Sequence, residues 1–177
     1  MGEGQLEAAG ILVRPMADAD YDEVHALWLR CAGMGLNDVD DSREGIARLL
    51  ARNPETCLVA ETVPAGGVCA APGDDALPEA PAPDRRVVGC ILVGFDGRRA
   101  YVYHTAVDPD SRGEGIGRAL VEAELAALGR LGVSKVALVA FSRNAGGNAF
   151  WERMGFGERH DLSYRDLALV RMVRTDT

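Results

Sequence analysis

The chain has 177 residues, 47% of them hydrophobic, and a formal net charge of −8. This length suits one domain with a substantial core, and no apolar run is long enough to span a membrane. The negative charge argues against nucleic acid as a partner, because such binding relies on Lys and Arg at the phosphates, but it is compatible with a cationic substrate such as an amine.

The hydrophobic spacing of residues 11–107 predicts alternating strands and helices. We expect strands over residues 11–16, 56–62, 86–95 and 99–107, and helices over residues 18–31 and 42–52. Asp96-Gly97 lies between the last two strands and is a strong signal for a tight hairpin. Residues 63–84 hold five of the eight prolines together with Gly and Ala, so we expect a flexible loop there.

The remainder of the chain continues the α/β order after a glycine-rich turn. A helical pattern covers residues 119–131, and Gly132 follows it, as glycine often does beyond a helix. The nearly all-apolar run 135–141 predicts a strand covered on both faces. A short helix over residues 146–154 and a final antiparallel pair of strands, over residues 157–164 and 166–173, complete the pattern, without an internal repeat.

The cysteines and the first residues bear on the cellular compartment. The four cysteines show no C-x-x-C spacing, and Cys57 and Cys90 fall in apolar strand patterns. We therefore expect reduced cysteines that fill the core, rather than a disulfide or a metal site. Residues 1–10 lack the basic and apolar regions of a signal peptide, so the expected location is cytoplasmic.

The glycine-rich turn lies between the apolar run 101–107 and the following helix. Three glycines alternate with other residues from Arg112 to Arg118. Glycine lets the backbone approach a ligand closely, and the free N–H groups at the start of a helix favour an anion. A dinucleotide fingerprint needs glycine where Arg118 stands, and a P-loop needs a lysine there. The turn therefore predicts another phosphate-bearing ligand.

Two segments resemble the GNAT N-acetyltransferase family. Arg112-Gly113-Glu114-Gly115-Ile116-Gly117 fits the family's acetyl-CoA signature, R/Q-x-x-G-x-G/A, at the end of a strand. The segment from Asn144 to Phe156 is similar to the family segment N-x-x-A-x-x-F/L-Y-x-x-x-G-F. The resemblance covers about residues 11–173, and in detail it points to an uncharacterised bacterial subgroup that names no substrate.

The resemblance implies a fold and an activity. The fold is α/β (α+β), one domain over residues 1–177, with a mixed, mostly antiparallel sheet of about six to seven strands and about four helices. The sheet splays between its fourth and fifth strands, over residues 101–107 and 135–141, with the cofactor in the opening. The activity is transfer of an acetyl group from acetyl-CoA to the primary amine of a small molecule or peptide, by direct attack in a ternary complex. A homodimer is plausible for the family.

The resemblance also assigns residues to the two substrates. The cofactor would contact Thr105, Ala106, Val107, Arg112, Gly113, Glu114, Gly115, Ile116, Gly117, Arg118, Asn144, Phe150 and Trp151. The acceptor would contact Trp28, Met34, Leu36, Asn37 and Tyr101. Asp38, Asp40 and Asp41 follow the acceptor segment, where their carboxylates either attract an ammonium group or belong to a solvated loop.

An amine must lose its proton before it attacks, so a base is expected near the thioester. Strict strand alternation puts Tyr103 and His104 on opposite faces, so only one faces the substrate unless a bulge resets the phase. His104 has a suitable side chain for a base, with a hydrogen-bonded structural role as the alternative. Related enzymes place substrate-facing groups on the side of Tyr101 and Tyr103, so Tyr103 is the second catalytic candidate, lining the acceptor site and acting through ordered water. His25 and His160 are expected to be structural or exposed.

Trp151 departs from the family pattern. Many members have a tyrosine there that protonates the leaving thiolate, whereas the indole N–H of tryptophan is only a donor. Another group then serves, such as Tyr103, Tyr164 or water, or CoA leaves as the thiolate. Phe150 and Trp151 are also compatible with plain core packing. A non-catalytic acyl-CoA-binding domain and the transfer of a longer acyl group remain the alternatives.

Overall fold

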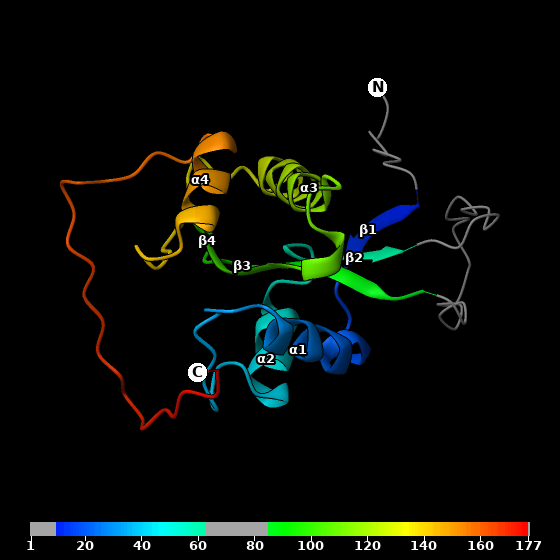
Figure 1. The fold of residues 1–177 in the computed structure, drawn as a ribbon. Helices are drawn as coiled ribbons and strands as arrows, with labels where there is room; N and C mark the ends of the chain where they lie inside the picture. The colour runs from blue at the N-terminus through cyan, green and yellow to red at the C-terminus, as the bar shows by residue number, and fades with distance from the viewer. Residues whose placement is uncertain (1–9, 63–84, 177) are drawn as a thin grey trace.

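The computed structural model describes residues 10–62 and 85–176, which form a five-stranded sheet with helices on both faces (Figure 1). The elements are β1 (Ile11–Pro15), α1 (Tyr21–Arg30), α2 (Arg43–Arg52), β2 (Cys57–Thr62), β3 (Val87–Phe95), β4 (Ala100–Val107), α3 (Ile116–Arg130), β5 (Val136–Leu138) and α4 (Ala145–Arg153). Strands β1 to β4 are antiparallel neighbours in chain order, and β5 is parallel to β4 at the edge. The expected α/β order is confirmed, although the described sheet has five strands where six to seven were expected. The loop expected at residues 63–84 lies outside the described residues.

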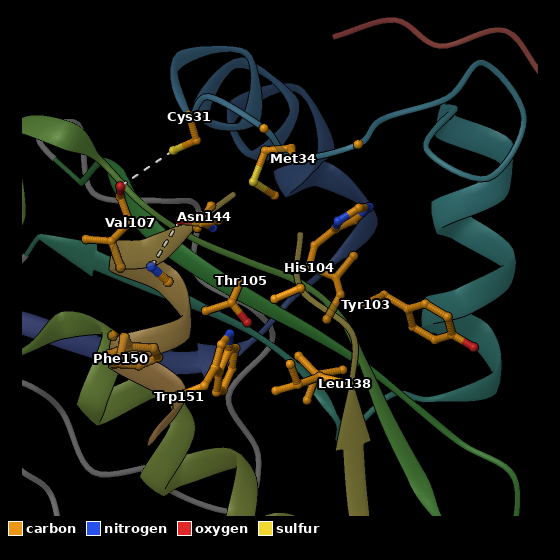
Figure 2. A pocket seen from close by; sticks show the side chains of 18 of the residues that line it. Cys31, Met34, Tyr103, His104, Thr105, Val107, Leu138, Asn144, Phe150 and Trp151 are labelled. Carbon is orange, nitrogen blue, oxygen red and sulfur yellow. Dashed lines mark hydrogen bonds between the residues drawn. The ribbon is translucent and has the colours of Figure 1, made fainter. Parts of the chain in front are cut away.

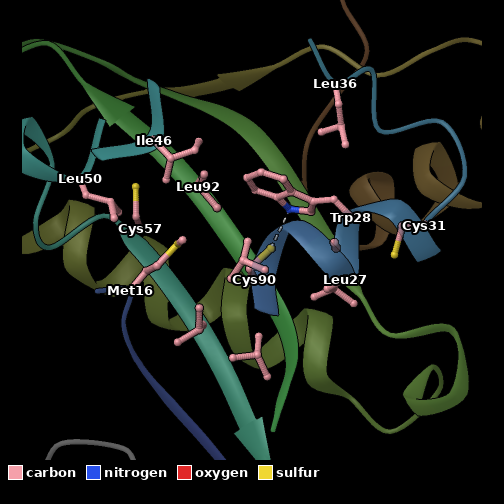
Figure 3. Close-up of a cluster of buried hydrophobic side chains, with 14 residues drawn as sticks. Met16, Leu27, Trp28, Cys31, Leu36, Ile46, Leu50, Cys57, Cys90 and Leu92 are labelled. Atoms are coloured by element: carbon pink, nitrogen blue, oxygen red, sulfur yellow. Dashed lines mark hydrogen bonds between the residues drawn. The ribbon is translucent and has the colours of Figure 1, made fainter. Parts of the chain in front are cut away.

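Two hydrophobic cores lie on the two faces of the sheet. α1 and α2 cover one face, where Trp28 is fully buried and its indole N–H donates to Cys90 Sγ at 3.2 Å (Figure 3). α3 covers the other face, where Leu120 and Val121 pack against β3. Complete burial of an aliphatic side chain of this size contributes about 1.5–3 kcal/mol. The sheet is therefore fixed from both sides before the chain reaches β5.

The cysteines have the core role that their strand patterns predict. Cys57 and Cys90 are completely buried and unpaired. Burial raises the pKa of each thiol to about 12, because a thiolate would lose its hydration there. Within the described residues there is no cluster of His, Cys, Asp and Glu that could hold a metal ion, and no helix that could span a membrane.

The helix boundaries follow local chemistry. Ser42 caps α2, with its Oγ accepting the Gly45 N–H at 3.0 Å. α3 starts directly after Gly115, and Gly132, with a φ of 73°, follows the end of the helix as predicted. The first turn of α3 therefore begins inside the glycine-rich segment, three residues earlier than the apolar pattern alone suggested.

Strand β5 is shorter than expected. It covers only Val136–Leu138 and pairs with Ala100–Val102 of β4, after which the two strands diverge. The prediction of a strand covered on both faces over residues 135–141 is wrong. Ala137 is exposed within β5, and beyond Leu138 the side chain of Val139 is 54% exposed and lines an open cleft together with Phe141. The divergence itself is the splay that the sequence resemblance implied.

The final antiparallel pair of strands, expected over residues 157–164 and 166–173, is absent. Residues 157–172, here called the C-terminal arm, instead form an extended arch from α4 to the side of α1 and α2 (Figure 1). At one end Phe156 packs on Trp151 with ring centroids 5.0 Å apart, and at the other Asn37 and Arg174 form an antiparallel bridge. A hairpin needs its two ends side by side, so these separated anchors prevent it.

Proteolysis tests the arm. It makes no backbone hydrogen bond to any other part of the described chain, and Leu169 is 90% exposed. Residues 1–9 and 63–84 contain no Lys or Arg, so trypsin cannot cut within them. We expect the first tryptic cut after an arginine of the arm, detected by mass spectrometry, because exposed unpaired backbone is the preferred substrate. The sites are Arg159, Arg165 and Arg171.

The matched control is the triple Arg→Gln variant at those three sites, which should remain intact over the same interval. An early cut after Arg112 or Arg118 while the arm stays whole would contradict the extended arm.

Glu124 is a buried acid within α3. Its side chain is 1% exposed and neither carboxyl oxygen has a hydrogen-bond partner in the described chain. Burial raises the pKa of Glu124 from 4.5 to about 8, since the charged form would lose its hydration. Between these two values the unfolded chain is ionised while the folded chain keeps the proton. Stability therefore falls as the pH rises from about 4.5 to about 8.

The variant Glu124→Gln should lose this pH dependence. Wild-type protein should lose up to about 4 kcal/mol of unfolding free energy across the window, at about 1.4 kcal/mol for each pKa unit. Urea denaturation at a series of pH values measures the slope for both proteins. Glu122→Gln is the control, because Glu122 lies on the same helix but is 40% exposed and pairs with Arg118. Parallel slopes for wild type and Glu124→Gln would show that Glu124 ionises normally.

Candidate active site

A cleft of about 1760 Å³ opens where β4 and β5 diverge. Figure 2 shows its two sides: Phe150 and Trp151 of α4 lie on one, and Met34 and His104 lie toward α1 and α2 on the other. Val107 and Thr105 of β4 form the floor between them. The cleft thus joins the glycine-rich turn to the segment expected to hold the acceptor.

A β-bulge in β4 decides which side chains face each half of the cleft. His104 lies opposite Leu92 and Val102 opposite Val93, so Tyr103 is an extra residue in β4. The bulge resets the alternation. Val102 packs in the hydrophobic core on the α3 side of the sheet, here called the α3 core; the core on the side of α1 and α2 is called the α1 core. His104 instead stacks on Trp28 of α1, with ring centroids 5.0 Å apart. The expectation of strict alternation along β4 is therefore wrong at Tyr103, where the bulge changes which face the following side chains point to.

The bulge brings together residues that unbroken alternation would separate. Tyr101 lies between two residues of the α3 core, so it points to the same side as His104. Thr105 lies between His104 and Ala106, which faces the α1 core, so Thr105 points toward α4 (Figure 2). One strand thus supplies Tyr101 and His104 to one half of the cleft and Thr105 to the other.

His104 is held by a carboxylate from a distant part of the chain. Its Nε2 lies 2.6 Å from Asp41 Oδ1, and the two side chains are only 12% and 6% exposed. The second oxygen of Asp41 accepts the Asn37 backbone N–H at 2.7 Å. Both His104 and Asp41 line the cleft. Asp41 therefore belongs neither to a solvated loop nor to a free ammonium-binding surface.

The two tyrosines extend the same half of the cleft. The rings of Tyr101 and Tyr103 lie 5.1 Å apart, and Tyr103 is 56% exposed at the rim. Burial raises the pKa of the Tyr101 phenol, so it stays protonated near neutral pH. Met34 and Asn37 also line the cleft, as the acceptor assignment expects.

Two residues expected at the acceptor lie behind the surface of the cleft. Trp28 and Leu36 are fully buried in the α1 core and do not line the cleft. Trp28 instead packs against the His104 ring, and its indole N–H donates a hydrogen bond to Cys90 Sγ. Helical spacing places Trp28 on the apolar face of its helix, and Leu36 belongs to the apolar loop that follows. Apolar residues of this kind serve the core as readily as a ligand.

The glycine-rich turn forms the other end of the cleft. Gly113 and Gly115 have φ values of 87° and 86°, and a Cβ at either would meet no atom within 4 Å. These left-handed positions favour glycine and leave the N–H groups before α3 in open space. Arg112, Ile116 and Arg118 line the cleft together with the glycines, whereas Glu114 does not.

The turn is fixed by the end of β4. Asp108 is 2% exposed, and its carboxylate accepts from Arg30 at 2.7 Å and from the Asp110 N–H at 3.0 Å. Gly117 completes the turn by close packing, because a Cβ there would meet the Phe150 ring at 3.3 Å. α1 and α4 thereby hold the two ends of the turn.

α4 contributes a cap and two aromatic rings. Asn144 caps the helix by accepting the Gly147 N–H at 3.0 Å, and it lines the cleft. Phe150 and Trp151 both line the cleft and pack against the α3 core. Core packing is therefore confirmed, and their contact with the cofactor stays a prediction. Opposite them, Thr105 Oγ1 is buried without a hydrogen-bond partner in the described chain.

The sequence reasoning missed Asp41 as the partner of His104. The two residues are 63 positions apart, and no local pattern links them. Phe141 was missed as well; it lines the cleft and lies beside Gly35 and under the guanidinium of Arg174, 5.2 Å from its ring centroid. Both residues depend on the tertiary fold and left no signal in their own segments.

Comparison with known proteins agrees with this arrangement. The model of the acetyltransferase (GNAT) family matches residues 21–156. An acetyltransferase of Photorhabdus laumondii is 30% identical over 151 residues, which cover 85% of this chain and 90% of the relative.

Solved structures show the same fold. Ard1 from Thermoplasma volcanium has a TM-score of 0.65 at 19% identity, over 84% of both chains. The PaiA N-acetyltransferase from Thermoplasma acidophilum, solved in complex with coenzyme A, has a TM-score of 0.61 at 15% identity, over 83% of this chain and 89% of that one. The family match spans most of the chain and includes the cleft-forming strands and turn, so this chain belongs to the GNAT family of acetyltransferases.

Proposed function

We propose that the protein transfers the acetyl group of acetyl-CoA to a primary amine of a small molecule or peptide, by direct attack in a ternary complex. The observation that carries the proposal is the Asp41-bound His104 in the same cleft as an open, glycine-lined helix start. Acetyl-CoA is the co-substrate of the family and supplies an activated acyl group as a thioester. A cytoplasmic location and a homodimer stay predictions.

The residues of the cleft fit coenzyme A. The open cradle at Gly113 and Gly115 would hold the pyrophosphate through backbone N–H groups, and Arg112 and Arg118 would add charge-assisted hydrogen bonds. The unpaired Thr105 Oγ1 needs a partner, because a buried hydroxyl without one costs about 1–3 kcal/mol. The backbone of residues 105–107, with Asn144, Phe150 and Trp151, would line the pantetheine arm and thioester.

His104 would take the proton of the acceptor amine. An alkyl ammonium has a pKa of about 10.4, so its neutral form at pH 7 costs about 4–5 kcal/mol without a base. His104 is aimed into the cleft by Asp41 and Trp28. Tyr101 and Tyr103 would line the acceptor, with the exposed carboxylate of Asp40 at the rim to attract its positive charge.

Trp151 removes the usual proton donor to the leaving group. Its indole N–H has no readily transferable proton. A thiol has a pKa of about 8.5, so CoA can leave as the thiolate without a dedicated acid. This feature supports a site in which His104 handles the amine proton and the leaving group departs unassisted.

Thiol release tests the activity. The protein is incubated with acetyl-CoA and a panel of polyamines, amino acids, aminoglycosides and peptides, and free thiol is measured. We expect amine-dependent release, and His104→Gln should lower kcat by about 10²–10⁴-fold with an unchanged Kd for acetyl-CoA, as for loss of a general base. His160→Gln is the control, because that side chain is 81% exposed on the arm. Acetyl-CoA binding without release on any amine, or full activity of His104→Gln, would contradict the proposal.

The cofactor site is tested by a pair of glycine variants. Gly115→Asp places a carboxylate where the pyrophosphate would lie and should abolish acetyl-CoA binding in calorimetry. Gly97→Asp is its matched control, since Gly97 has a φ of 89°, equally open surroundings and a place in the β3–β4 hairpin outside the cleft. Both variants carry the same strain and charge. Equal affinities for the two would exclude this placement of coenzyme A.

A further inference from the structure

We infer that Asp41 is a positioning residue that fixes the tautomer of His104, so that His104 Nδ1 is the atom that receives the amine proton. The inference rests on the proposed function, in which His104 is the base. It adds a residue from the loop before α2 to the site, and it names which ring nitrogen faces the substrate.

The hydrogen bond between the two side chains sets the tautomer. An ionised carboxylate can only accept, so Asp41 Oδ1, 2.6 Å from His104 Nε2, requires the proton on Nε2. A neutral imidazole carries one proton, which leaves Nδ1 with a lone pair. In the described part of the chain Nδ1 has no hydrogen-bond partner, while His104 lines the cleft. The free lone pair is therefore available to a bound amine.

Asp41 is itself held in place. Its Oδ2 accepts the Asn37 N–H at 2.7 Å and lies 3.3 Å from Asn37 Nδ2, and its backbone carbonyl accepts the Tyr21 hydroxyl at 2.9 Å. Ser42 directly after it caps α2. The carboxylate thus cannot follow the ring if the ring rotates, and Trp28 restricts the ring from the other side.

In the proposed proton transfer, each nitrogen of His104 has a separate role. The N–H bond of the acceptor ammonium breaks, and its proton moves to His104 Nδ1, leaving the lone pair on the amine for attack. His104 becomes an imidazolium whose Nε2–H still donates to Asp41. The Asp41 charge stabilises that cation across a hydrogen bond with little solvent around it.

The variant Asp41→Asn is expected to reverse the tautomer of His104. The Asn37 N–H would keep its acceptor, so the carboxamide oxygen takes the Oδ2 position and the NH₂ group faces His104. An NH₂ group donates, so Nε2 must give up its proton, and the proton moves to Nδ1. The substrate-facing nitrogen then has no lone pair, although the size and shape of the side chain are unchanged.

Nitrogen NMR reads the tautomer without any substrate. The chain has three histidines, at positions 25, 104 and 160, so ¹⁵N-histidine labelling gives three ring spectra, assigned with His→Gln variants. Spectra are recorded at rising pH until the ring signals stop changing, so that they report the neutral imidazole. In that form we expect the proton of His104 on Nε2 in the wild type and on Nδ1 in Asp41→Asn. Asp22→Asn, an exposed carboxylate paired with Arg43, is the matched control and should leave the wild-type pattern. A neutral wild-type His104 that carries its proton on Nδ1 would overturn the inference even if Asp41→Asn failed to fold.

Kinetics with an acceptor from the thiol-release panel completes the test. Asp41→Asn should lower kcat by about 10²–10⁴-fold while the KM for acetyl-CoA stays within about twofold, as expected for a base in the wrong tautomer. A changed tautomer with an unchanged kcat would overturn the positioning role. If no amine on the panel reacts, the proposed function fails, while the NMR result still decides whether Asp41 sets the tautomer.

Discussion

The extra residue that the bulge at Tyr103 inserts into β4 controls how one strand serves both halves of the cleft. Before the bulge, Ala100 and Val102 belong to the α3 core, and after it Ala106 belongs to the α1 core. His104 is thereby turned toward Trp28 and Asp41, while Thr105 is turned toward α4. Without this change of phase, His104 would point into the α3 core and could not meet a carboxylate from the loop before α2.

The divergence of β4 and β5 supplies the space that the bulge organises. β5 pairs with β4 for only three residues, and its continuation turns into the cleft wall. Beyond Val102, the edge of β4 that faces β5 therefore has no strand paired with it in the described chain, although the other edge of β4 still pairs with β3. The glycine-rich turn follows the end of β4 and is held by the buried Asp108, so the helix start proposed to hold the pyrophosphate follows the strand that carries the candidate base. A bound donor and acceptor would meet between them.

Local patterns predicted most of the helices and strands and the glycine-rich turn after β4, because these depend on neighbours in sequence. Examples are the Asp96-Gly97 hairpin, with Gly97 at a φ of 89°, and the turn ending at Arg118. The acceptor half was harder, since Asp41 meets His104 across 63 residues. The C-terminal arm shows the same limit. Its sequence has a pattern typical of strands, but the separated contacts of Phe156 and Arg174 at its two ends keep a hairpin from forming.

We expect the opening between β4 and β5 to bind acetyl-CoA beside His104, and a crystal structure of the protein with coenzyme A would decide this. Density for the cofactor should lie in this cleft, with the pyrophosphate at the N–H groups of residues 113–117 and a ligand atom within hydrogen-bonding distance of Thr105 Oγ1. Coenzyme A bound outside the cleft, or a cleft closed by the C-terminal arm in the complex, would contradict it.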